Sequence, residues 1–224
     1  MHGQKWESDL RILFPKRTIR ALAIDMNGQF VLITRFLRPL KPPESLLSNS
    51  ARLTDEMMLR LARFVSLIPS IPDNVALPGF GDVWCPCNQF LDMLIGDEEE
   101  HAILLCNFFL YLGKRAGVIL GSGIPEGPTA YVIVWEYTGQ DPSIWNPSTG
   151  EKLRVHDSFL PLNAVGTIFT AENVYANIQK YEHPNRLEYD ITRTSYWKPL
   201  FNRKFPNPGL VSIQVSNLPV YLLD

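Results

Sequence analysis

Cysteine and histidine are the residue types in this sequence that could carry nucleophilic chemistry. The chain has three cysteines, at positions 85, 87 and 106, and four histidines, at positions 2, 101, 156 and 183. A thiolate beside an imidazole attacks carbonyl carbon, so Cys85 or Cys87 with His101 or His156 would make a cysteine peptidase or amidase. A reactive thiol needs a helix N-terminus or a nearby cation. Cys106 lies deep inside an apolar segment and is interpreted as a buried core residue.

The same residue types could also bind a metal ion. Cys85-Pro86-Cys87 has the form of half a zinc site. A structural zinc ion needs four ligands, usually in two pairs, and no second Cys or His pair follows. Packing or a loop thiol explains the two cysteines better, so we predict no metal and no cofactor.

Composition indicates a folded protein of ordinary type. The chain has 224 residues, 46% hydrophobic and 20% charged, which is enough for one sizeable core or two small ones. The net charge of −2 and the pI of about 6.1 argue against nucleic acid as a partner. An odd number of cysteines favours a reducing compartment.

No segment of the sequence has the pattern of a leader or a membrane span. The start, MHGQKWESDL, lacks the apolar segment of a signal peptide. The longest apolar run, residues 102–112, is too short to cross a bilayer and contains Asn107. We therefore expect a soluble, cytoplasmic protein without direct membrane insertion.

A buried helix is predicted from Asp97 to Gly113. Asp97 is a suitable N-cap, and Glu98, Glu99 and Glu100 fill the first turn, where carboxylates interact favourably with the helix dipole. The following residues are apolar on all sides, which is typical of a helix inside a core. The plainest interpretation of the three glutamates is that they only start this helix.

The N-terminal half contains a predicted hairpin, a linker and two helices. Residues 17–37 read as a hairpin around Asn27-Gly28, a dipeptide that suits a type I′ turn. Three prolines place a linker at residues 38–50. The capping and hydrophobic pattern predicts a helix at residues 54–69, and a short helix is predicted at residues 87–96.

Strands dominate the prediction for the C-terminal half. Residues 116–121 and 129–137 have the β-branched and aromatic content of strands, and residues 144–155 read as strand, turn and strand. One helix followed by several strands fits an α+β fold. In the tail, the pattern predicts helices at residues 171–181 and 195–201 and a strand at residues 186–193.

The order of these elements resembles the transglutaminase-like (papain-like) peptidase core, with a buried helix packed on an antiparallel sheet. In that family a cysteine opens the helix, a histidine begins a later strand and an aspartate lies in the next turn. The resemblance assigns these three places to Glu98, Thr129 and Asn146. None of the three residues can perform the original step, since glutamate is a poor nucleophile without a base and threonine does not shuttle protons near neutral pH.

A more specific resemblance is to the coiled-coil and C2 domain-containing 2 family of ciliary transition-zone proteins. It rests on WCPCNQFLDMLIGDEEEHAILLCNFFLYLG, GSGIPEGPTAYVIVWE, IWNPSTG and NIQKYEHPNRLEYDITR, and it covers about residues 80–210. It implies a degenerate, non-catalytic transglutaminase-like domain in residues 51–224, after a remnant of a preceding region in residues 1–50. It also implies a scaffold at the cilium base, with other transition-zone proteins or an extended peptide as partners.

The resemblance predicts a cleft that binds a ligand without cutting it. Glu98, Thr129 and Asn146 would face one another, and the aromatic residues of the neighbouring strands, Tyr131, Trp135 and Trp145, would line the cleft. An acidic group there would favour a basic or amine-bearing peptide. Two alternatives remain open: a cleft filled by its own side chains, and a protein–protein module without a pocket function.

Overall fold

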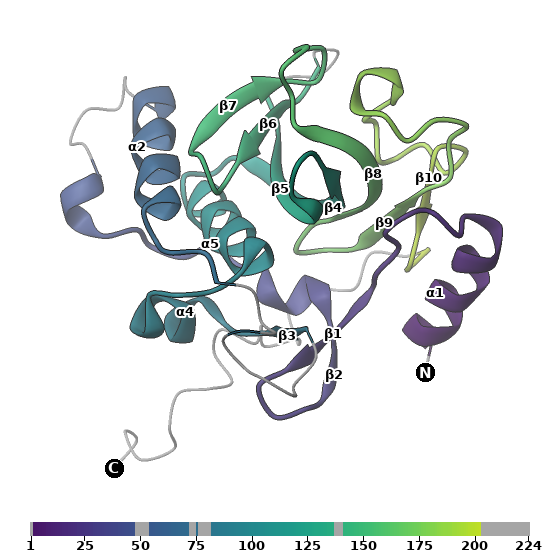
Figure 1. The fold of residues 1–224 in the computed structure, drawn as a ribbon, viewed down its shortest axis with the longest axis horizontal. Coiled ribbons are helices and arrows are strands. Elements are labelled where there is room, and N and C mark those ends of the chain that lie inside the picture. The colour runs from purple at the N-terminus through teal and green to yellow at the C-terminus, as the bar shows by residue number, and fades with distance from the viewer. Residues whose placement is uncertain (1, 48–53, 72–74, 76–81, 137–140, 203–224) are drawn as a thin grey trace.

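A seven-stranded antiparallel sheet with one helix buried against it forms the centre of the computed structural model (Figure 1). The structure describes residues 2–47, 54–71, 75, 82–136 and 141–202. The strand order is β10-β9-β8-β4-β5-β6-β7. The strands are β4 (Arg115–Gly123), β5 (Gly127–Trp135), β6 (Ser143–Asn146), β7 (Glu151–Arg154), β8 (Leu162–Phe169), β9 (Val174–Asn177) and β10 (Trp197–Pro199).

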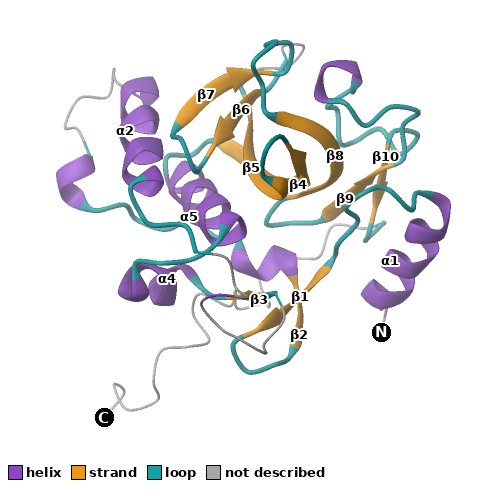
Figure 2. Ribbon diagram, viewed as in Figure 1, coloured by secondary structure: helices purple, strands orange, loops and turns teal. Residues whose placement is uncertain are grey.

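A small sheet and several helices surround the large sheet (Figure 2). The small sheet has the order β2-β1-β3, with β1 (Leu22–Asp25), β2 (Phe30–Leu32) and β3 (Val83–Trp84). The helices are α1 (His2–Leu13), α2 (Thr54–Ser66), α4 (Cys87–Met93) and α5 (Glu98–Tyr111), with the 3-10 turns η1 (Ile33–Phe36), η2 (Glu44–Leu46) and η3 (Pro184–Arg186). Among the described residues, no helix has the length and apolar character that crossing a membrane requires.

Helix α5 has the ends that its sequence predicts. The Asp97 carboxylate accepts from the Glu99 amide at 3.0 Å, and the Glu100 carboxylate accepts from the Asp97 amide at 3.1 Å, which makes a capping box. Gly113 follows the helix with a φ of 73°. The helix packs against β4 and β5 on one side and α2 and α4 on the other. The predicted α+β class, with a buried helix on an antiparallel sheet, is confirmed.

Side chains of β5 alternate between two cores. Ala130, Val132 and Val134 belong to the larger core, which contains α5. Tyr131 and Ile133 belong to a smaller core on the other face, which residues 187–197 cover. This alternation decides which residues of the strand can reach the helix.

The N-terminal segment packs into the same core as α5. Trp6, Ile19 and Phe36 are buried members of the larger core. At Gly166 a Cβ atom would come within 2.3 Å of the Thr18 carbonyl oxygen, so only glycine permits this approach of two backbones. The predicted boundary at residue 50 lies outside the described residues.

Asn107, the polar residue within the apolar run, has hydrogen-bond partners in the segment that precedes α2. Its side-chain amide donates to the Phe36 carbonyl at 2.9 Å, and its side-chain oxygen accepts from the Arg38 amide at 2.7 Å. Its own carbonyl accepts from the Leu40 amide at 3.1 Å. This fully buried residue therefore fixes residues 36–40, where the predicted hairpin meets the predicted linker, on the helix.

Most predicted elements of the first 155 residues are confirmed, whereas those of the tail are wrong. The hairpin forms with Leu22 opposite Leu32 and Gly28 at a φ of 72°. The predicted helix at residues 171–181 is strand β9, and the predicted helix at residues 195–201 contains strand β10. The predicted strand at residues 186–193 is irregular: it starts at the last residue of η3 and contains one turn. Strand β8 was not predicted.

Candidate functional site

Glu98 lies at the position where the resemblance places a catalytic cysteine. It is the first residue of α5 and is half-buried, while Asp97 and Glu100 complete the capping box on either side of it. Glu100 also accepts a hydrogen bond from the Cys85 amide at 3.1 Å, which ties the segment before α4 to the start of α5. The helix start is therefore a closed arrangement of carboxyl groups and backbone amides, with Glu98 at its edge.

Two of the carboxyl groups at the helix start hold their protons tightly. Burial raises the pKa of Glu99 well above its usual range, and the neighbouring Asp97 and Asp82 raise it further, while Arg20 opposes the rise. Burial also raises the pKa of Glu100 strongly, with Asp97 as the next cause. Each proton can be shared with Asp97, so the group acts as a hydrogen-bonded acid cluster.

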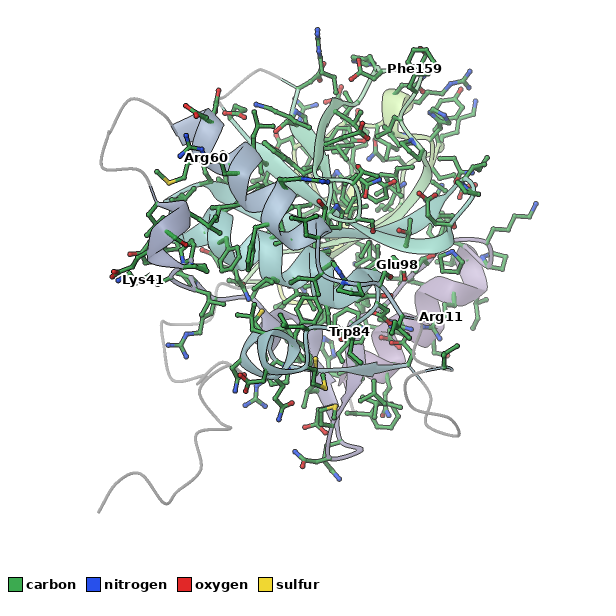
Figure 3. All side chains as sticks on the ribbon, turned by 60° about the vertical axis from the view of Figure 1, so that its left-hand side comes forward. Arg11, Lys41, Arg60, Trp84, Glu98 and Phe159 are labelled. Atoms are coloured by element: carbon green, nitrogen blue, oxygen red, sulfur yellow. The ribbon has the colours of Figure 1, made fainter. Side chains whose placement is uncertain are left out.

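The side chain of Trp84 fills the space beside the helix start. It is fully buried and packs edge-on against Phe36, with ring centroids 5.4 Å apart, and in a tilted arrangement against Phe169 at 5.9 Å. Arg20 covers its outer side at 5.6 Å and forms an ion pair with Asp82 at 2.5 Å. Figure 3 shows Glu98 and Trp84 in the same part of the molecule, away from Phe159 at its upper edge.

Tyr131 and Asn146 are brought together as predicted neighbours. The Asn146 side-chain amide donates to the Tyr131 hydroxyl at 3.1 Å. The Asn146 side-chain oxygen accepts from the amides of Ser148 at 2.9 Å and Thr149 at 3.4 Å, so Asn146 also stabilises the β6–β7 turn. Burial raises the pKa of Tyr131, so its hydroxyl stays protonated and can donate in turn.

Thr129 shares a sheet face with Tyr131 rather than with α5. The residue between them, Ala130, points into the core that contains the helix, so Thr129 points to the opposite face. No hydrogen bond of the described residues joins Glu98 to Thr129 or Asn146. The structure therefore does not group Glu98 with these two side chains, and a ligand-binding role for Glu98 remains a prediction.

The two predicted cleft tryptophans lie on different faces of the sheet. Trp145 is fully buried on the α5 face, where its ring packs edge-on against Phe109 at 5.0 Å. Trp135 is half-buried on the other face and donates from its indole nitrogen to the Tyr189 carbonyl at 3.0 Å. Trp145 thus belongs to the core, and Trp135 fixes the segment that covers the smaller core.

A sequence model of the CEP76 peptidase-like domain matches residues 82–200, more than half of the chain. This chain belongs to the CEP76 peptidase-like domain family. The matched range begins beside Trp84 and includes α4, α5 and the whole seven-stranded sheet. The site residues described above from Asp82 onward therefore lie within the family domain.

Several relatives extend the similarity over most of the chain. Human protein CC2D2B is 36% identical over 222 residues, covering 99% of this chain and 15% of the relative. Coiled-coil and C2 domain-containing protein 2A of Drosophila melanogaster is 28% identical, covering 87% and 14%. The human centrosomal protein of 76 kDa is 26% identical, covering 89% and 31%. The predicted resemblance to the coiled-coil and C2 domain-containing 2 family is confirmed.

The chain spans less than a third of the length of each of these relatives. Among solved structures, calcium-bound LapG of Legionella pneumophila matches with a TM-score of 0.49 and 14% identity. The match covers 62% of this chain and 76% of that chain.

The thiols of this CEP76 peptidase-like domain are core residues. All three cysteines are buried, and burial raises the pKa of Cys106 far above its usual range. Cys87 accepts a hydrogen bond from the Asn107 side chain at 3.2 Å. A thiol in such surroundings carries little thiolate at neutral pH, so its nucleophilicity is low.

The two histidines of the alternative Cys–His dyad, His101 and His156, both have other polar partners. The ring nitrogens of His101 lie 2.5 Å and 2.9 Å from the carbonyl oxygens of Asp97 and Ile68. Both ring nitrogens are thus directed at backbone carbonyls inside the protein, where the side chain is buried. His156 is exposed near the end of β7, where its ring lies 3.1 Å from the Asp141 carboxylate.

Sequence reasoning missed the residues that close the helix start. Arg20 lies in the predicted hairpin and Trp84 begins the WCPC segment, but only the fold brings them and Asp82 to the start of α5. Within the described ranges, no group of three or more His, Cys, Asp or Glu side chains is arranged to hold a metal ion. The cluster of carboxyl groups is thus explained by capping and shared protons.

Proposed function

We propose that this chain is a non-catalytic transglutaminase-like module that serves as a scaffold and peptide-binding unit in cilium assembly. One observation carries the loss of catalysis: the start of the buried helix presents Glu98 in place of a thiol. The position of His101, whose two ring nitrogens lie against carbonyl oxygens, supports it further. Membership of a peptidase-like family supports an origin from a peptide-binding fold. Binding can outlast cutting because the two depend on different free-energy terms.

The proposed location is the cytoplasmic side of the ciliary transition zone. Two relatives support this location because they belong to the coiled-coil and C2 domain-containing 2 family. A third relative bears the name of a centrosomal protein. The proposed partners are other transition-zone proteins or an extended peptide. A tagged form of the protein in ciliated cells should gather at the ciliary base, and an even cytoplasmic distribution would contradict this part of the proposal.

A cysteine-directed probe tests whether the domain has a working nucleophile. We expect iodoacetamide at pH 7 to modify the folded protein slowly at all three cysteines, because each side chain is buried. The same reaction in denaturant should label all three rapidly, which is the matched control. Rapid labelling of one thiol in the folded protein, lost on His101→Ala or His156→Ala, would favour the cysteine peptidase or amidase instead.

Glu98 is the proposed acidic contact for a basic or amine-bearing peptide. Its carboxylate is half-buried at the edge of the capping box, so it can reach a ligand without breaking the helix start. On an array of basic and acidic peptides, Glu98→Ala should weaken the binding of the basic peptides several-fold. Glu151→Ala, at an exposed site on β7, is the control. Equal binding by both variants would remove this role for Glu98.

A further inference from the structure

A second site lies at the end of β9, outside the region discussed so far. An open hollow of about 560 Å³ is bordered by residues of two segments that are distant in sequence. The lining residues are Arg17, Lys180, Tyr181, Glu182, His183, Asn185 and Arg186. Figure 2 shows the second segment rising from β9 to η3, beside the edge of the sheet and away from α2 and α4.

The walls of the hollow are held rigidly. The Arg17 guanidinium donates to the carbonyls of Asn177 at 2.5 Å and Gln179 at 2.6 Å, and its side chain is only 8% exposed. The Asn177 side chain donates to the Tyr181 carbonyl at 3.1 Å. In addition, the Val165 amide donates to the Glu182 carbonyl at 2.8 Å. A site fixed in this way loses little conformational entropy when a ligand binds.

Two cations of the hollow are available to a ligand. Lys180 Nζ lies 5.3 Å from the centre of the Tyr181 ring, and Arg186 Cζ lies 5.0 Å from it. Within the described part of the chain, no carboxylate forms an ion pair with either of them. The carboxylate in the hollow, that of Glu182, is 3.6 Å from Arg17 and is neutralised there.

The hollow is therefore positive on a chain whose net charge is −2. Arg17, Lys180 and Arg186 outnumber Glu182 by three charges to one. Tyr181 adds an apolar ring that is 41% exposed between the polar groups. A local excess of cations attracts anionic groups, and an arginine fork binds carboxylates in a defined geometry.

We propose that this hollow binds an acidic peptide segment of a protein partner. Lys180 and Arg186 take carboxylates of the segment, and the Tyr181 ring contacts an apolar side chain between them. The volume of about 560 Å³ falls in the range of sites for drug-sized ligands and exceeds what one small anion fills. A lipid surface would need a broad basic face, whereas the hollow offers three cations around one aromatic ring.

This proposal goes beyond the scaffold function and uses none of the residues of α5. A failed test of this site would leave the loss of catalysis and the role of Glu98 untouched. Conversely, rapid labelling of a thiol would not affect the binding expected at Lys180 and Arg186.

Binding is tested by fluorescence anisotropy with the whole chain and a labelled twelve-residue peptide rich in glutamate, with a phenylalanine at every third position. We expect saturable binding that Lys180→Glu/Arg186→Glu weakens at least tenfold. The charge-conserving variant Lys180→Arg/Arg186→Lys should stay within about threefold, since the cations are retained. Tyr181→Ala should lower the affinity for the peptide several-fold. A peptide with serine in place of phenylalanine should bind Tyr181→Ala and the parent chain equally well.

The matched control reverses two cations elsewhere. Lys41 and Arg60 lie on the other side of the molecule, in ion pairs near η2 and on α2 (Figure 3). Lys41→Glu/Arg60→Glu changes the net charge by the same amount, so it should leave peptide binding nearly unchanged. Thermal unfolding of each variant checks that the fold persists.

Three outcomes would overturn the proposal. Equal weakening by the two charge-reversed variants would show a nonspecific effect of net charge. Full competition by millimolar inorganic phosphate would indicate a site for a small anion. Binding of phosphatidylserine vesicles that is lost in Lys180→Glu/Arg186→Glu, with no binding of the peptide, would indicate a lipid surface.

Discussion

Replacing Trp145 with alanine is expected to lower the free energy of unfolding by about 3–5 kcal/mol. The side chain is fully buried between the sheet and α5, with its ring 5.0 Å from that of Phe109. Its indole nitrogen donates to the Ser143 hydroxyl at 3.1 Å, so the variant also leaves a buried hydroxyl without this contact. Urea denaturation followed by circular dichroism measures the change.

Trp135→Ala is the matched control, because this tryptophan is half-buried on the other face of the sheet. Its loss removes one hydrogen bond to Tyr189 and the contact with Arg115, at 5.2 Å, and should cost less, about 1–3 kcal/mol. If Trp145→Ala left stability unchanged and instead abolished peptide binding, Trp145 would be the cleft wall that the sequence predicts.

The fold could be predicted where local signals are strong and agree with the tertiary structure. Asp97 caps α5 as the sequence predicts, and the apolar residues that follow the first turn predict burial on all sides. Asn27-Gly28 makes its turn because glycine adopts the positive φ at little cost. In both places, residues close in sequence supply the determining interactions.

The tail was predicted wrongly because its structure depends on distant partners. In β9, Val174 and Ala176 are buried and Tyr175 is half-buried, an alternation that fits a strand between β8 and β10. The segment is short and contains helix-forming alanine and polar residues, so local propensity favours a helix. Pairing with two neighbouring strands overrides that preference.

The candidate site was predicted only in part, since the sequence gives the alternation of a strand but not the face that a helix covers. Thr129 and Ala130 point to opposite faces whatever the fold, and only the structure shows that Ala130 faces α5. Trp84 begins the WCPC segment, in which no local pattern shows that its ring packs against Phe36 and Phe169. By contrast, the resemblance already places Tyr131 and Asn146 in one cleft, and the structure joins them by a hydrogen bond between neighbouring strands.

Protonation of the carboxyl groups at the start of α5 should make stability fall as the pH rises. The pKa of Glu99 and that of Glu100 are raised in the folded chain, so between the ordinary carboxyl value of 4.5 and the raised values the folded chain holds protons that the unfolded chain has released. Stability then decreases with pH across that window, by about 1.4 kcal/mol for each tenfold difference in proton affinity. Below pH 4.5 both states are protonated, and the full contribution is present.

Glu99→Gln should flatten this slope, because the amide keeps the shape of the protonated carboxyl group and can still donate to Asp97. We expect the variant to gain stability relative to the parent chain steadily from about pH 4.5 to 7.5, as measured by urea denaturation at each pH. Glu98→Gln is the control, because it removes a neighbouring carboxyl group from the same helix turn and changes the net charge by the same amount. Parallel pH curves for the parent and Glu99→Gln would mean that Glu99 is ionised in the folded chain. Arg20, which opposes the rise in the pKa of Glu99, would then outweigh burial and the charges of Asp97 and Asp82.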